Sequence, residues 1–417
     1  MEQKIRVVKY YLVLIILSVL IFLSESSSAQ YFKFEGKRKR EVIQFKLVKN
    51  LMIIPVIING SGPYNFVLDT GVGLFLITDP KLVDTIQISN LRSIKITGFG
   101  AGSDLGAFVT PSLKVEIGST VAESISAAIL KKDIFELSSY AGMPIHGLIG
   151  YEFFNSFTVK ISYATSVITI YRPDKRYILR KGTKIPITIE EKKPYMVTEI
   201  TLSDGRKISV KLIIDTGAGH PVSLENYEGR PFDIPPVNIA ANLGVGLSGA
   251  INGYIGRIPS IKLGKYTLNN VIASFPDYSD VGSRVMSVSR NGNMGNSILK
   301  RFDVLFDYAA QAMYLKPSAY LKEPFEHDMS GMELASAGPD YTRVVITRIE
   351  PFSPAEAIGL RKDDEILAIN FKAVSGMTMQ EIDNLFRSRD GRSFILEVVR
   401  NKGKDRERVI LTLERRI

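Results

Sequence analysis

The chain has no cysteine and only three histidines among its 417 residues. The lack of cysteine excludes disulfides, a lipid-bearing cysteine, thiolate metal sites and cysteine-protease chemistry. The histidines stand far apart, at His146, His220 and His327, so no metal-ligand spacing arises. We therefore expect no metal and no cofactor.

Long helical periodicity is also scarce before residue 320. Segments such as 157–161 and 167–171 are rich in β-branched and aromatic residues, and Gly, Pro, Asn and Ser turn signals separate such segments. Hydrophobic residues make up 45% of the chain, enough for real cores, and the length suggests more than one domain. The sequence predicts a mainly β protein with several domains.

The charge balance is basic, with a formal net charge of +10, but the basic residues are scattered. Acidic residues interrupt even the densest basic run, 400–416, and no aromatic residues alternate with the basic ones there. This pattern favours a solvated basic face, so we expect no nucleic-acid partner.

The first 29 residues have the composition of a secretory signal peptide. Lys4, Arg6 and Lys9 form a basic start, residues 11–23 are apolar, and small residues at 27–29 are typical of a cleavage site. An uncleaved membrane anchor is the alternative, although spanning usually needs about 20 apolar residues. Under either interpretation the protein is exported, to the periplasm, the envelope or the medium, and export without disulfides favours a bacterial source.

Asp-Thr-Gly occurs twice, at 69–71 and 215–217, and each copy ends an apolar run, 66–68 and 212–214. A single copy would indicate no more than a surface turn. Two carboxylates brought face to face can share one proton, which leaves one group to activate water and one to protonate a substrate oxygen. The pair therefore predicts a catalytic dyad of Asp69 and Asp215.

An internal repeat relates the two triplets. At an offset of about 146 residues, the glycine cluster 98–100 aligns with 244–246, and 114–118 aligns with 260–264. At an offset of 145, three further pairs align: Gly150 with Gly295, Phe157 with Phe302, and Tyr163 with Tyr308. The alignment predicts a duplicated lobe, so the dyad forms within one chain and we expect a monomer.

Polar segments near 172–182 and 316–324 mark the expected boundaries between units. The predicted units are a signal peptide (1–29), a first lobe (30–178), a second lobe (179–325) and a C-terminal domain (326–417).

The residues around the two aspartates suit this chemistry. Gly71 and Gly217 permit a sharp turn and offer backbone N–H groups to the carboxylates. Thr70 and Thr216 can hydrogen-bond across to the other triplet. One carboxylate would take a proton from water as the water attacks a peptide carbonyl, while the protonated partner donates to the carbonyl oxygen.

Over residues 45–315 the chain resembles the pepsin-like and retropepsin-like aspartic proteases. The resemblance implies two β lobes, each with an Asp-Thr-Gly loop braced by an apolar-apolar-Gly segment, here 148–150 and 293–295. Asn293 departs from that pattern. It also implies a glycine-rich flap that closes over substrate. The expected flap residues are Gly98, Phe99, Gly100, Ala101 and Gly102 in the first lobe, with Gly244, Val245 and Gly246 as their counterpart.

Val72 and Ala218 follow the triplets, where pepsin-like enzymes usually place Ser or Thr. Loss of a hydroxyl that stabilises the charged form should raise the pKa values of the dyad. We expect activity at mildly acidic to neutral pH, as in retropepsin-like enzymes with Ala at this position.

Two other motifs carry less weight. Residues 244–249 satisfy G-x-G-x-x-G, but a strand-like segment follows where a dinucleotide site needs a helix. Residues 295–297 resemble the serine segment of chymotrypsin-like proteases, yet the repeat already explains the segments that hold His146 and His220. We expect His220 to be a loop residue near the cleft.

From about residue 328 the pattern changes to an α+β domain. Ser353 and Thr378 are expected helix N-caps, each with a glutamate three residues later, and 394–399 and 408–413 are expected strands. The order resembles a bacterial-type PDZ domain, most specifically at 353–360, with Asp363 in place of the usual glycine. The resemblance implies that a peptide C-terminus adds a strand beside 333–336. The expected carboxylate-binding loop is Gly331, Met332, Glu333 and Leu334. A domain that only packs against the lobes is the alternative.

The sequence thus predicts an exported aspartic endopeptidase whose PDZ domain binds peptide or protein C-termini, with membrane contact only through an uncleaved N-terminal segment. The alternative is a non-catalytic peptide-binding or scaffold protein of the cell envelope.

Overall fold

The computed structural model describes residues 31–96, 105–173, 177, 179–246, 249–281, 288–400 and 405–417. The protein is 52% strand and 11% helix, which confirms the predicted mainly β fold. Within the described ranges, no helix is long and apolar enough to cross a membrane. The predicted signal peptide lies outside these ranges.

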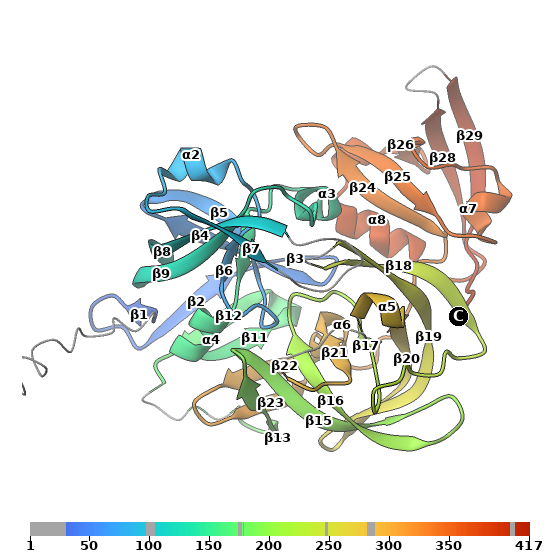
Figure 1. Ribbon diagram of the computed structural model, residues 1–417. Helices are drawn as coiled ribbons and strands as arrows, with labels where there is room; N and C mark the ends of the chain where they lie inside the picture. Colours follow the sequence, from blue (N-terminus) through green and yellow to red (C-terminus); the bar gives the residue numbers. More distant parts are fainter. Residues whose placement is uncertain are drawn as a thin grey trace, which may run out of the picture.

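The N-terminal lobe is built on a nine-stranded sheet (Figure 1). Its central strands run β9-β6-β10-β5-β4-β8, with β1 and β7 at the two ends and β3 beside β4. The strands are β1 (Lys33–Phe34), β3 (Lys46–Val48), β4 (Leu51–Ile58), β5 (Ser61–Leu68), β6 (Phe75–Ile77), β7 (Arg92–Ile96), β8 (Leu105–Ile117), β9 (Thr120–Leu130) and β10 (Gly147–Ile149). Its helices are α2 (Leu82–Ile86), α3 (Leu137–Ala141) and α4 (Tyr151–Ser156).

The second lobe is built on an eight-stranded sheet in the order β14-β15-β16-β21-β17-β20-β19-β18. The strands are β14 (Thr188–Glu190), β15 (Lys193–Thr201), β16 (Lys207–Asp215), β17 (Val222–Leu224), β18 (Asn238–Gly246), β19 (Gly249–Leu263), β20 (Tyr266–Pro276) and β21 (Gly292–Gly295). Two short helices, α5 (Tyr278–Val281) and α6 (Asn296–Leu299), flank β21 in the chain.

A six-stranded sheet takes strands from both lobes. It runs β13-β23-β22-β11-β12-β2, and β11 pairs antiparallel with β22 between residues 159–162 and 303–306. The strands are β2 (Arg40–Gln44), β11 (Thr158–Ser162), β12 (Val167–Tyr171), β13 (Thr183–Pro186), β22 (Phe302–Asp307) and β23 (Ala312–Pro317). One hydrophobic core also spans both lobes. The shared sheet and the shared core together fix how the two lobes are placed relative to each other.

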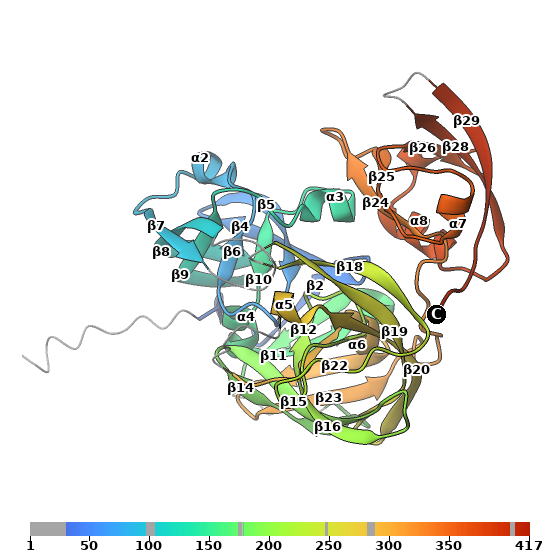
Figure 2. The ribbon, with the colours of Figure 1, turned by 45° about the vertical axis from the view of Figure 1, so that its right-hand side comes forward.

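The C-terminal domain has a separate core and its own six-stranded sheet (Figure 2). The Ser353 hydroxyl accepts from the Glu356 amide, and Thr378 and Glu381 form a reciprocal capping box, as predicted. The strands are β24 (Met332–Ala337), β25 (Arg343–Ile349), β26 (Glu365–Ile369), β27 (Lys372–Ala373), β28 (Ser393–Arg400) and β29 (Asp405–Thr412). The helices are α7 (Pro354–Ala357) and α8 (Met379–Phe386).

Candidate active site

Each Asp-Thr-Gly triplet stands at the end of a central strand, β5 or β16, whose apolar residues just before the aspartate, 66–68 and 212–214, are buried. β5 pairs in parallel with β10, and β16 pairs in parallel with β21. These short partners are the predicted braces. The second one keeps its place although Asn293 is not apolar. A Cβ on Gly150 would lie 2.0 Å from Asp69 O, so this brace position requires glycine.

Thr70 and Thr216 join the two loops. Both are completely buried. The Thr70 amide donates to Thr216 Oγ1 and the Thr216 amide donates to Thr70 Oγ1, each at 2.9 Å. Each hydroxyl donates to a carbonyl of the opposite strand, Thr70 Oγ1 to Ile214 O at 2.6 Å and Thr216 Oγ1 to Leu68 O at 2.8 Å. The predicted cross-loop hydrogen bonding of the threonines is confirmed.

The two carboxyl groups lie together, each against the glycine of the other loop. A Cβ on Gly217 would lie 2.2 Å from Asp69 Cγ, and a Cβ on Gly71 would lie 2.8 Å from Asp215 Cγ. Within each loop the glycine amide donates to the aspartate, at 2.6 Å for Asp69 and 2.9 Å for Asp215. Each glycine thus leaves room for the carboxyl group of the opposite loop, and its backbone amide hydrogen-bonds the aspartate of its own loop.

The electrostatics of the pair favour one bound proton. Asp69 is only 9% exposed. Burial, and then the neighbouring Asp215 carboxylate, raise the pKa of Asp69 well above its usual range, against the opposing effect of the Gly71 amide. Lys193, on β15, lies near enough to influence both aspartates, and burial lowers its own pKa. The raised pKa is in the direction expected from the absence of a hydroxyl at Val72 and Ala218.

Asn293 and His220 make contacts at the candidate site that the sequence did not indicate. Asn293 Nδ2 donates to Asp215 Oδ2 at 3.3 Å, and its Oδ1 lies 2.6 Å from His220 Nε2. In the sequence, the only signal of this contact was that Asn293 stands where the brace pattern has an apolar residue. His220 belongs to the loop after the second triplet, as expected, and it contacts the dyad through Asn293.

A hairpin turn from each lobe contacts the Asp-Thr-Gly loop of the other lobe. Lys49 O would lie 2.6 Å from a Cβ on Gly219, and Asn50 Nδ2 donates to Gly219 O at 2.9 Å. In the opposite direction, a Cβ on Gly73 would lie 3.2 Å from the Cβ of Lys192. Each turn therefore contacts the loop just beyond the other lobe's triplet.

Buried Asn296 ties the first turn to the second triplet. Its amide nitrogen donates to Asn50 O at 2.7 Å and to Thr216 O at 2.6 Å. Its Oδ1 accepts from the Tyr163 hydroxyl at 2.6 Å. Asn296 thus links both lobes behind Asp215.

The predicted flap residues fall partly outside the described ranges. Gly98, Phe99, Gly100, Ala101 and Gly102 lie outside them, and β7 and β8 flank that segment. Gly244, Val245 and Gly246 end β18 and pair with β19. Gly244 has a φ of +124° beside an irregularity in register, which a residue with a side chain would rarely adopt. The second-lobe segment is therefore a hairpin end, the shape that a flap requires.

The predicted carboxylate-binding loop precedes and begins β24. Gly331 has a φ of +77°, and a Cβ there would lie 2.1 Å from the Cβ of Ser353, so glycine is required. Its amide donates to Asp328 Oδ1 at 3.1 Å, and the Met332 amide donates to Ser330 Oγ at 3.1 Å. Two amides of this loop already have partners within the chain. Carboxylate binding by Gly331, Met332, Glu333 and Leu334 stays a prediction.

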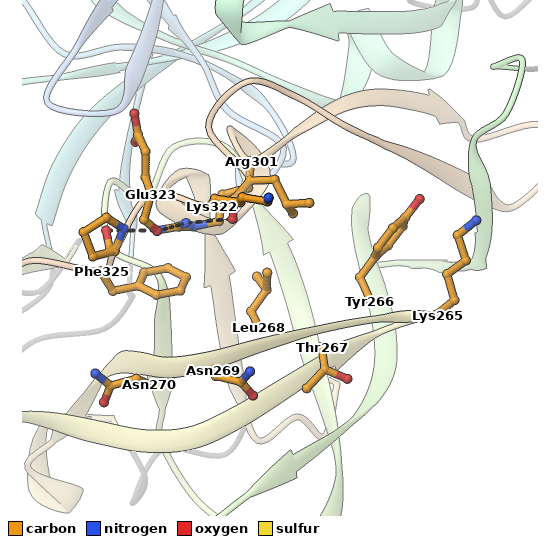
Figure 3. Close-up of a pocket in the computed structure, with 12 residues that line it drawn as sticks. Lys265, Tyr266, Thr267, Leu268, Asn269, Asn270, Arg301, Lys322, Glu323 and Phe325 are labelled. Atoms are coloured by element: carbon orange, nitrogen blue, oxygen red, sulfur yellow. Dashed lines mark hydrogen bonds between the residues drawn. The ribbon is translucent and has the colours of Figure 1, made fainter.

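A cavity of about 590 Å³ lies away from the dyad, between the start of β20 and residues 321–325 (Figure 3). The Arg301 guanidinium donates there to the carbonyls of Tyr320, Leu321 and Pro324. The cavity therefore belongs to the connection that follows β23. Across the described residues, no group of three His, Asp or Glu side chains could hold a metal.

The paired loops, the crossed threonines and the adjacent carboxyl groups form the arrangement expected for a site of the aspartic-protease type. Comparison with protein families agrees. Residues 54–153 match the family model for an aspartyl protease, and residues 345–400 match the model for a PDZ domain. The chain thus carries an aspartyl protease domain followed by a PDZ domain. The second triplet lies outside the first match, and no curated protein matches the chain significantly.

Proposed function

We propose that the protein is an exported aspartic endopeptidase that hydrolyses peptide bonds with water activated between Asp69 and Asp215. The observation that carries the proposal is the packing of each carboxyl group against the glycine of the opposite loop. This arrangement leaves two oxygen-rich groups with one proton between them at the junction of two lobes.

The reaction needs no covalent intermediate. The ionised carboxylate removes a proton from water as the water oxygen bonds to the peptide carbonyl carbon, and the protonated carboxyl gives its proton to the carbonyl oxygen. In the resulting diol, the first carboxyl delivers its new proton to the amide nitrogen and the C–N bond breaks. One diol hydroxyl returns a proton to the second carboxylate, which restores the starting state.

The PDZ domain supplies a second peptide-binding element. β24 is the edge strand of its sheet, with β25 on one side. An extended peptide adds to such an edge through main-chain hydrogen bonds. We propose that the domain binds peptide or protein segments there, and that the N-terminal segment directs export.

We expect the cleavage optimum at mildly acidic to neutral pH, because the raised pKa of Asp69 keeps the required proton bound as the pH rises. A sharp optimum below about pH 3, where carboxylates with low pKa values operate, would contradict this expectation.

The test compares cleavage of an unbiased peptide library by the wild type, Asp69→Asn and Asp215→Asn. We expect cleavage by the wild type alone, because each substitution removes one member of the proton-sharing pair. An exposed aspartate of α2 offers a matched control, Asp84→Asn. Equal cleavage by all variants, or none by the wild type, would remove the enzyme proposal, and the second outcome favours the scaffold alternative.

Export is tested separately, by fractionation of cells that express the full chain and N-terminal sequencing of the product. A periplasmic or secreted chain that begins at Gln30 supports export with cleavage. A chain retained in the cytoplasm contradicts export.

A further inference from the structure

Asp215 is held at both oxygens. The Gly217 amide donates to Oδ1 at 2.9 Å, and Asn293 Nδ2 donates to Oδ2 at 3.3 Å. In the first lobe, Leu148 occupies the position that aligns with Asn293. Its side chain has no polar atom to offer Asp69. Because hydrogen bonds from N–H donors stabilise a carboxylate, the two aspartates are not equivalent.

His220 fixes the direction of the Asn293 amide. The side-chain oxygen of Asn293 can only accept, and it lies 2.6 Å from His220 Nε2, so the two form a hydrogen bond in the tautomer that carries the proton on Nε2. That contact leaves the NH₂ group of Asn293 facing Asp215. Turning the amide by half a rotation would place its oxygen against the carboxylate and its NH₂ group against the imidazole.

Other ionisable groups around the dyad do not reverse this asymmetry. Lys193 acts on both aspartates. Glu225 lies near Asp215, but Arg290 pairs with it through two hydrogen bonds, at 2.9 and 3.0 Å. Tyr308 lies near Asp69 and is buried. Asp69 is buried whereas Asp215 is half-buried, so Asp69 has the less solvated surroundings of the two.

We infer that Asn293, oriented by His220, is a positioning residue that keeps the ionised carboxylate on Asp215 and the shared proton on Asp69. In the proposed reaction, Asp215 takes the proton from water and Asp69 donates to the carbonyl oxygen. The kinetic consequences rest on the proposed peptidase function.

The kinetic test uses Asn293→Leu, the residue present at position 148. We expect kcat to fall about 10- to 100-fold, the range for one hydrogen bond to a charged group, with a much smaller change in KM. The acid limb of the kcat/KM profile should move to higher pH. His220→Leu should shift it the same way, and His220→Gln, which keeps an N–H donor, should restore the wild-type profile.

Asn291→Leu is the matched control. Asn291 lies just before β21 and its side chain bonds the backbone of Lys211 and Asn226, so its loss loosens the same strand without touching Asp215. An unshifted acid limb in Asn291→Leu supports the inference. An unshifted limb in Asn293→Leu, or equal shifts in both variants, overturns it.

A second readout does not need activity. Titration of ¹³C-labelled aspartate carboxyl groups by NMR, assigned with Asp69→Asn and Asp215→Asn, should show in the wild type that Asp69 is the member of the pair that keeps its proton to higher pH. In Asn293→Leu the gap between the two titrations should narrow. An unchanged gap, or Asp69 ionising first, overturns the inference even if the protein cleaves no peptide.

A different observation concerns the surface between the outer edge of β24 and α8, where the resemblance to PDZ domains places a bound peptide; we call this surface the PDZ groove. The N-terminal lobe covers it, with α3 lying against β24 and α8 (Figures 1 and 2). A Cβ on Gly142 would lie 2.7 Å from Met379 Cγ and 2.9 Å from Ser336 Oγ. Lys49 Nζ donates to Leu334 O on β24 at 3.4 Å.

The contact extends from the groove to the dyad. The Lys49 amide donates to Gln380 of α8, and the Lys49 ammonium lies 4.3 Å from the centre of the Tyr140 ring. The adjoining Asn50 holds Gly219, four residues beyond Asp215. The same turn therefore contacts the PDZ domain on one side and a catalytic loop on the other.

We also propose that α3 and Lys49 are the resident occupants of the PDZ groove, and that a peptide ligand competes with them. The groove cannot hold both, because Lys49 already uses a carbonyl on the edge where a peptide strand would pair. This proposal rests on the PDZ domain and not on the peptidase activity.

The probe is a phage-displayed library of random C-terminal heptapeptides, panned against the immobilised full chain. We expect the double variant Lys49→Ala/Tyr140→Ala to enrich binders at least about tenfold over the wild type, as expected when a competing contact is removed. Lys46→Ala, an exposed lysine of β3, is the control and should match the wild type. Equal enrichment by wild type and double variant, or none by either, overturns the proposal.

Discussion

The loops at 69–71 and 215–217 make the same contacts with each other but meet different side chains behind them. Threonine, glycine and brace strand repeat in both, with hydrogen bonds of nearly equal length. Behind Asp215 stand the amides of Asn293 and Asn296, and the aligned positions behind Asp69 are Leu148 and Tyr151. The geometry of the pair is thus close to symmetric, whereas its polarity is not.

The largest effect should come from the two threonines, which make the same contacts in both loops. Thr70→Val and Thr216→Val each remove a hydroxyl that makes two buried hydrogen bonds and leave their partners unpaired, so each should lower the free energy of unfolding by about 2–4 kcal/mol. Urea unfolding measures both losses. Clearly unequal losses of unfolding free energy in the two variants would contradict the symmetry. Thr201→Val is the control: its hydroxyl pairs with Ser260 at a partly exposed site, so its loss should be smaller than either.

The next prediction concerns the polar difference. Asp69 has a raised pKa when folded, so between its unfolded pKa and the folded one the folded state binds more protons, and stability falls as pH rises through that window. Asp69→Asn removes this loss, worth about 1.4 kcal/mol for each unit of pKa elevation. We expect the variant to melt above the wild type at neutral pH, but not near pH 3. Asp84→Asn should follow the wild-type curve throughout.

The smallest expected effects on stability concern Tyr163 and Tyr308, which the internal repeat aligns with each other. Tyr163→Phe leaves buried Asn296 Oδ1 without its donor and should cost about 1–2 kcal/mol. The Tyr308 hydroxyl is buried with no hydrogen-bond partner among the described residues, so Tyr308→Phe should be neutral or slightly stabilising. Thermal unfolding of both variants decides the comparison. Equal losses would show that the second hydroxyl has a partner as well.

Local patterns predicted the strands, the triplets and the helix caps of the C-terminal domain. An apolar run before Asp-Thr-Gly is readable because burial and a tight glycine turn act on neighbouring residues. The Asn293–His220 contact joins a strand residue to a loop residue 73 positions away, and neither side chain is specified by its local sequence pattern. It arises where β21 is placed beside β16, which local pattern does not encode.

The Lys49–Asn50 turn teaches the same lesson over a longer distance. A lysine and an asparagine between two strands predict a turn, and both have the left-handed φ that such a turn requires. Their contacts with Gly219 and Gln380 depend on how three domains pack, and such contacts leave no periodic signal in the chain. The Tyr163–Asn296 bond, between lobes, is of the same kind.

The sheet shared by the lobes bears on how the protein can be made and cut. Its β11–β22 pairing means that neither lobe is a complete folding unit. Expressed alone, the first lobe would present β11 as a bare edge with Val159 and Ile161, both fully buried in the whole chain, at its rim. Such an edge recruits another strand, so an isolated half would tend to pair with a second copy or aggregate.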